Sequence, residues 1–189
     1  MFKDKECIKL ADEIYVFKNY VPKDMLDRYV QLLDSIPVKD FKEDNEAEGW
    51  YSDHMSPMIL ELIDLWEHVS DLLYPEYFIN PQPQIIASRP GQPGMFVHCD
   101  SPGKGKVDML TQEDTFCTCA LIDYGVVTYL SDFEGGELNF PELNFEYKPK
   151  KGDLLIFPKK YSTEVKEVKS GIRYSYLDYM TAHPGYIIV

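Results

Sequence analysis

Histidine and tryptophan are scarce in this chain, with four histidines and two tryptophans among 189 residues. Basic residues are also outnumbered, since 19 lysines and arginines stand against 32 aspartates and glutamates, a formal net charge of −13. Such a charge repels phosphate backbones and anionic headgroups, so we expect neither nucleic acid nor membrane as a partner. The chain has no apolar run of transmembrane length, and its charged N-terminus does not resemble a signal peptide, so we expect a cytoplasmic protein.

Cysteine is equally rare, with four residues at positions 7, 99, 117 and 119. Their spacing matches no zinc finger or zinc ribbon. Cys117 and Cys119 would share one face of a strand, where free cysteines behave as small hydrophobic side chains. We therefore expect core cysteines in a reducing compartment rather than a metal or redox site.

A length of 189 residues with 44% hydrophobic and 14% aromatic side chains indicates one folded domain, residues 1–189. Apolar spacing predicts one helix after Pro22 and a second that begins at Ser56-Pro57. The apolar stripes are Met25, Leu26, Tyr29, Leu32 and Leu33 in the first helix, and Ile59, Leu60, Ile63, Trp66 and Val69 in the second. The acidic stretch 39–48 between them is expected to be an exposed loop.

From residue 84 onward, short apolar segments alternate with glycine and proline turns. Including one strand at 12–17, the expected strands are 84–88, 95–98, 116–122, 126–130, 137–140, 145–148, 153–157, 163–168 and 172–180. Many short strands with such turns are typical of a double-stranded β-helix, or jelly roll. We predict a mainly β fold with flanking helices, in which a helical part (1–80) packs on a jelly roll (84–189).

The segment His98-Cys99-Asp100 is the leading candidate for a metal site. Residues i and i+2 of a strand point to the same face, so the His98 imidazole and the Asp100 carboxylate can bind one ion. Histidine and carboxylate together are two-thirds of the triad that binds Fe(II) in non-haem oxygenases. The motif is short and would be weak evidence by itself.

Three segments in order make the sequence resemble the prolyl 4-hydroxylase-like branch of the 2-oxoglutarate/Fe(II)-dependent dioxygenases. They are His98-Cys99-Asp100, then 129–138 (YLSDFEGGEL), then 152–175, which contains GDLLIFP and the spacing Gly171-x-Arg173-x-Ser175. The segment 14–22 is similar to the family's first strand. Similar sequences are common in marine bacteria and their phages. If the chain is encoded by a phage, we expect it in the host cytoplasm or in a virion.

The resemblance implies roles for several residues. Fe(II) would be held by His98 and Asp100, and 2-oxoglutarate would be the co-substrate. Arg173 would bind the distal carboxylate of 2-oxoglutarate through its planar guanidinium, with help from the Ser175 hydroxyl and from Tyr129. Gly135 and Gly136 would form a tight turn that joins the two sheets.

One iron-binding position departs from the family's pattern. The second iron-binding histidine of the family falls two residues before the valine that matches Val165, and here that residue is Thr163. A hydroxyl is a poor Fe(II) ligand compared with imidazole. The adjacent Glu164 would point away from the face of Thr163 unless the strand contained a bulge. The other histidines, at 54, 68 and 183, do not replace it by register.

Two function classes therefore remain. The first is a dioxygenase of the prolyl 4-hydroxylase type that hydroxylates a C–H bond of a peptidyl side chain, for example prolyl, or of a small molecule. The second is a non-catalytic structural or binding module on a degenerate oxygenase fold, such as a phage or bacterial assembly component with a protein partner. Retention of His98, Asp100 and Arg173 favours the first class. Thr163 favours the second, as does Arg89, which stands where the family commonly has a tyrosine before the Pro-Gly turn.

Two short basic stretches are Lys148 to Lys151 and Lys159-Lys160. Both fall at expected turns. We interpret them as solvated turn charges rather than as parts of a site.

Overall fold

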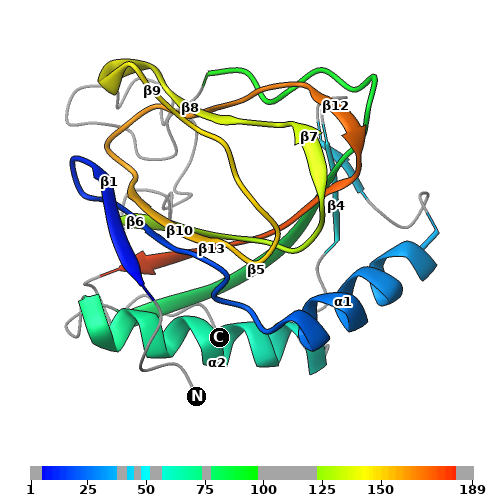
Figure 1. Cartoon of the computed structure of the whole chain (residues 1–189), viewed down its shortest axis with the longest axis horizontal. Coiled ribbons are helices and arrows are strands. Elements are labelled where there is room, and N and C mark those ends of the chain that lie inside the picture. The colour runs from blue at the N-terminus through cyan, green and yellow to red at the C-terminus, as the bar shows by residue number, and fades with distance from the viewer. Residues whose placement is uncertain are drawn as a thin grey trace, which may run out of the picture.

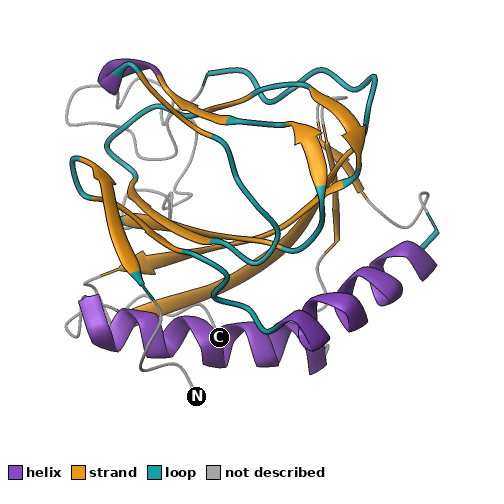
Figure 2. Cartoon of the chain, in the orientation of Figure 1, coloured by secondary structure: helices purple, strands orange, loops and turns teal. Residues whose placement is uncertain are grey.

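The computed structural model describes residues 6–37, 42–44, 48–51, 57–73, 78–97 and 123–181. These residues form two β layers that face each other, with two helices on the outer side of the larger layer (Figures 1 and 2). The predicted fold class, a mainly β jelly roll with flanking helices, is confirmed. In the described part of the chain no helix is long and apolar enough to cross a membrane.

The larger layer is an eight-stranded sheet in which all neighbouring strands are antiparallel. Its order is β1 (Cys7–Ala11), β2 (Ile14–Phe17), β10 (Leu154–Pro158), β6 (Tyr124–Tyr129), β13 (Arg173–Thr181), β5 (Phe78–Ser88), β4 (Glu48–Tyr51) and β3 (Lys42–Asp44). The N-terminal part of the chain thus contributes strands as well as helices to the structure.

The smaller layer covers the inner face of this sheet. It consists of β11 (Glu164–Val165), β8 (Leu138–Phe140) and β9 (Phe145–Tyr147), and of the pair β12 (Val168–Gly171) and β7 (Phe133–Gly135). A short 3-10 helix, Pro141–Leu143, connects β8 and β9. Alternation along the central strands divides the core: Val126 of β6 packs toward the helices, whereas its neighbour Val127 packs toward the smaller layer.

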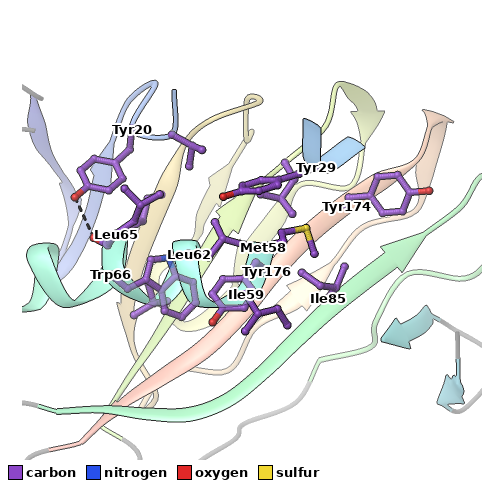
Figure 3. Packing of buried hydrophobic residues seen from close by; sticks show 14 of the residues in the cluster. Tyr20, Tyr29, Met58, Ile59, Leu62, Leu65, Trp66, Ile85, Tyr174 and Tyr176 are labelled. Carbon is purple, nitrogen blue, oxygen red and sulfur yellow. Dashed lines mark hydrogen bonds between the residues drawn. The ribbon is translucent and has the colours of Figure 1, made fainter. Parts of the chain in front are cut away.

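Helices α1 (Lys23–Ser35) and α2 (Pro57–Leu73) bury one apolar face each against the sheet (Figure 3). The Trp66 indole of α2 lies 4.3 Å from the ring of Tyr176. Its Nε1 donates a hydrogen bond of 2.7 Å to the Thr128 hydroxyl. Both helices were expected, but Leu32 and Leu60 are 45% and 47% exposed, because the buried stripes run through the neighbouring helical positions.

Other expectations differ from the structure. The acidic stretch 39–48, expected as a loop, includes strand β3 and the start of β4, at the edge of the sheet. The strand expected at 163–168 is divided into β11 and β12, which pair with different strands. Residues 95–97 are not in a strand. Cys7 is exposed, and the other three cysteines and the strand expected at 116–122 lie outside the described residues.

The turn at Gly152 and Asp153 ties the N-terminal strands to the centre of the sheet. The Gly152 carbonyl accepts hydrogen bonds from the backbone N–H groups of Tyr20 and Val21, at 2.7 and 3.2 Å. The Asp153 carboxylate is 1% exposed and accepts from Lys18 Nζ at 2.9 Å and from the Tyr147 hydroxyl at 2.6 Å. Burial, and then this hydrogen bond to Asp153, raise the pKa of Tyr147, so the phenol stays protonated as the donor.

We predict that Asp153→Ala lowers the free energy of unfolding by about 3 kcal/mol or more, because it leaves buried donors without their carboxylate. Urea denaturation checks this. Lys151→Ala, two residues before Asp153, is the matched control. It removes a partly exposed ion pair with Asp27, so it should change stability by less than about 1 kcal/mol. Equal effects of the two substitutions would contradict a central role for Asp153.

Candidate active site

A cavity of about 70 Å³ lies between the two layers. Its walls are mostly apolar, with a few polar side chains among them. The lining residues are Ile86, Met95, Val127, Leu138, Phe157, Lys159, Thr163, Val165, Arg173, Ser175 and Leu177. Three of the predicted site residues, Thr163, Arg173 and Ser175, are therefore brought to one cavity. An apolar pocket with a few convergent polar groups is the usual form of a small-molecule site.

Arg173 is the first residue of β13 and is 3% exposed. Its Nη1 donates a hydrogen bond of 3.2 Å to the hydroxyl of Ser175, which lies two residues along the same face. The guanidinium carbon lies 5.4 Å from the ring centroid of Tyr129. Tyr129 is opposite Ser175 in the pairing of β6 with β13. The buried guanidinium thus has a fixed position between a hydroxyl and an aromatic face.

Gly136 provides the space for the Arg173 side chain. A Cβ at Gly136 would lie 2.9 Å from Arg173 Cδ, closer than real Cβ contacts. Gly136 and Gly135 both have positive φ, 62° and 76°, a conformation that favours glycine. The expected tight turn is not formed, because Gly136 and Glu137 exchange backbone hydrogen bonds with Glu167 and Lys166 and continue the antiparallel pairing from β7 into β8. The glycine at 136 instead clears the stem of the cavity's arginine.

Thr163 is 5% exposed and lines the cavity immediately before β11. Glu164, the next residue, lies on the other face, where its carboxylate accepts hydrogen bonds from Lys166 Nζ at 2.7 Å and from the Asn139 amide at 2.9 Å. The hydrogen bond from Lys166 is the main reason that the pKa of Glu164 is lowered. Strand alternation therefore presents a hydroxyl, not a carboxylate, to the cavity at this position.

Met95 connects the cavity to the predicted metal motif. Its carbonyl accepts a hydrogen bond of 3.0 Å from the Val165 backbone N–H. A Cβ on the preceding Gly94 would clash with the Val165 carbonyl at 2.0 Å, so this close approach requires glycine. His98 and Asp100 lie outside the described residues, and their convergence on one metal stays a prediction. The described residues contain no cluster of three His, Cys, Asp or Glu side chains.

Lys159 was expected to be a solvated turn charge, and this is wrong. Lys160 is indeed on the surface, with a side chain that is 53% exposed, but Lys159 is 2% exposed and lines the cavity. Its Nζ lies 5.1 Å from the ring centroid of Phe157 and 4.6 Å from that of Tyr179. Alternation carries the inward face of Leu155 and Phe157 on to Lys159, and this signal was available in the sequence.

Comparisons with known proteins were made at the levels of sequence and structure. No protein-family model matches the sequence, and no curated protein matches it either. Solved structures do match. The viral collagen prolyl hydroxylase vCPH from Paramecium Bursaria Chlorella virus-1, in its 2OG complex, is 18% identical with a TM-score of 0.65, over 93% of this chain and 100% of that one.

Two further structures agree with this match. A prolyl-4-hydroxylase from Pseudomonas putida is 15% identical with a TM-score of 0.62, over 89% of this chain and 92% of that one. A prolyl hydroxylase from Trichoplax adhaerens, in complex with a hypoxia inducible factor peptide fragment, is 16% identical with a TM-score of 0.64, over 90% and 84%. At these identities the likeness concerns the fold: the chain has the fold of the prolyl 4-hydroxylase-like 2-oxoglutarate/Fe(II) oxygenases.

Proposed function

We propose that this protein is a 2-oxoglutarate- and Fe(II)-dependent dioxygenase of the prolyl 4-hydroxylase type. The observation that carries the proposal is the buried Arg173, held beside Ser175 in a cavity of the matching fold. Fold likeness alone would not support an activity, because one fold hosts many functions. The arrangement of these side chains within the cavity supports it.

The Arg173 end of the cavity fits the distal carboxylate of 2-oxoglutarate. A guanidinium offers five N–H donors in a planar fork that matches a carboxylate, so it can serve Ser175 and a ligand together. The Ser175 hydroxyl is 1% exposed, and it can donate to the same carboxylate. The surrounding apolar wall, which includes Val127 and Leu138, would exclude water and strengthen this charge pairing.

The residues that would hold the metal are His98 and Asp100, with Thr163 on the adjacent wall. Met95 supports this arrangement, because its bond to Val165 brings the chain to within three residues of His98 beside β11. The Thr163 hydroxyl is a weak oxygen donor, so a water molecule or this hydroxyl would replace the usual second histidine. When bound, Fe(II) with 2-oxoglutarate supplies the oxidising power to hydroxylate a C–H bond.

The proposed substrate is a peptidyl side chain, for example prolyl, or a small molecule. The Trichoplax neighbour is in complex with a peptide, which supports a peptide substrate for this chain. The chain's own role would be to hold 2-oxoglutarate at Arg173 and to leave the space beside Thr163 for the reacting carbon.

We predict that Arg173→Ala abolishes 2-oxoglutarate binding, a loss of about 100-fold or more in affinity, because two charge-assisted hydrogen bonds disappear. Arg173→Lys should weaken it by about tenfold, since lysine keeps the charge without the fork. Isothermal titration under anaerobic conditions with Fe(II) measures both. Arg28→Ala, on the exposed face of α1, is the control. Unchanged affinity in both Arg173 variants would remove this residue from the site.

A pair of glycine variants separates a local effect on Arg173 from general strain. Gly136→Ala and Gly91→Ala both place alanine at positive φ, 62° and 82°, and each should cost about 1 kcal/mol of stability. A Cβ at Gly91 meets nothing within 4 Å, whereas one at Gly136 meets Arg173. We predict that only Gly136→Ala weakens 2-oxoglutarate binding, by about tenfold. Equal affinities in the two variants would show that the Arg173 position is not critical.

The Thr163 position tests the metal centre. We predict that Thr163→His tightens Fe(II) binding by about tenfold or more, because it adds an imidazole to His98 and Asp100. An anaerobic Fe(II) titration measures binding, and succinate formation measures turnover of 2-oxoglutarate. Ser162→His is the matched control, because the Ser162 hydroxyl bonds to Glu142 rather than lining the cavity. If neither the natural chain nor Thr163→His binds Fe(II) or 2-oxoglutarate at millimolar concentration, the catalytic proposal fails.

A further inference from the structure

Lys159 occupies a gap that the central strands leave for it. Phe157, Gly125 and Tyr179 are neighbours in one row across β10, β6 and β13. A Cβ at Gly125 would lie 2.7 Å from Lys159 Cε and 3.0 Å from Lys159 Nζ. The ammonium therefore lies over the glycine, with a ring on each side. Glycine weakens the interior of a strand, so its presence in a central strand indicates that the space is used.

Lys159 and Arg173 approach the same cavity from opposite ends of β13. Lys159 Nζ contacts the ring of Tyr179, and Tyr179 lies six residues after Arg173 in β13. The backbones of Arg173 and Tyr179 are therefore about 20 Å apart along the extended strand. Leu177 and Val127, which pair with each other between the Ser175 row and the Tyr179 row, form an apolar wall between the two cations. A ligand held by Arg173 therefore leaves the Lys159 end for a second ligand.

We propose that Lys159 binds a carboxylate of the primary substrate, which makes this substrate an acid with an apolar body next to its reacting carbon. The inference rests on the proposed function, in which 2-oxoglutarate takes the Arg173 end. An ammonium has three donors, so Lys159 can bind a substrate oxygen while it keeps its contacts within the protein. The net charge of −13 favours a singly charged carboxylate over a phosphate. The carboxylate belongs either to a free acid or to an acidic side chain of a peptide.

Matched probe pairs test this inference and separate the two sources. The free-acid pair is hexanoate and hexanamide, and the peptide pair is N-acetylglutamate N′-methylamide and its glutamine analogue. Each is titrated by calorimetry into the full chain, with and without 2-oxoglutarate. We expect the charged member of at least one pair to bind about tenfold more tightly, and Lys159→Met to abolish this preference. A preference within one pair only identifies the source of the carboxylate.

Two further variants make the result specific to the position of the ammonium. Gly125→Ala keeps the net charge but displaces the Lys159 side chain, so it should also remove the preference. Gly125→Ala also provides the test of the proposal if Lys159→Met does not fold. Lys160→Met, which removes the adjacent exposed charge, should leave the preference intact.

The outcomes distinguish this inference from the proposed function. No charge preference in the natural chain, or an unchanged one in Lys159→Met, overturns the role of Lys159 while 2-oxoglutarate binding stands. Loss of 2-oxoglutarate affinity in Lys159→Met also overturns it, because the lysine would then serve the co-substrate. A charge preference at Lys159 in a chain that binds no 2-oxoglutarate would retain the anion site and remove the dioxygenase assignment.

Discussion

The buried carboxylate of Asp153 is the constraint on which the positions in the cavity depend. It fixes the turn before β10, where the backbone of Gly152 and Asp153 also exchanges hydrogen bonds of 2.7 and 3.0 Å with Tyr129. The pairing of β10 with β6 begins from this turn, with Leu154 opposite Thr128. Because side chains alternate along a strand, a slip of one residue would turn Phe157 and Lys159 away from the cavity. Lys18 and Tyr147 hold the carboxylate from two other parts of the chain.

Each of the two cations in the cavity occupies space that a glycine leaves open. Gly136 makes room for the stem of Arg173, and Gly125 makes room for the ammonium of Lys159. A buried charge is costly unless hydrogen bonds, rings or counter-ions compensate it. The contacts that stabilise these charges include the Ser175 hydroxyl beside Arg173 and the aromatic rings beside both side chains. An otherwise acidic chain therefore places two basic side chains in one cavity.

The sequence predicts the jelly roll well, because short alternating strands and glycine turns leave few other arrangements for its apolar residues. It predicts the Arg173 and Ser175 face for the same reason, since residues two apart share a side. The edge strand β3 was not predicted, because its sequence, Lys42 to Asp44, contains no apolar residue whose alternation could indicate a strand. Its backbone pairing with β4 defines the strand. Lys159 was missed because its charge and its position near a turn suggest solvent, although alternation from Leu155 and Phe157 places it on the inward face. The space that its ammonium occupies comes from Gly125, which is distant in sequence.

The replacement at Thr163 has an electrostatic consequence in the proposed enzyme. Two buried cations share the cavity with the proposed metal site and oppose the entry of a divalent cation. Thr163 offers neither a negative charge nor a strong donor to offset them. Anions bound at Arg173 and Lys159 would add negative charge beside the metal, so metal and carboxylate ligands would each strengthen the binding of the other. Iron affinity in this protein would then depend on its co-substrate and substrate more than it does in a site with three strong protein ligands.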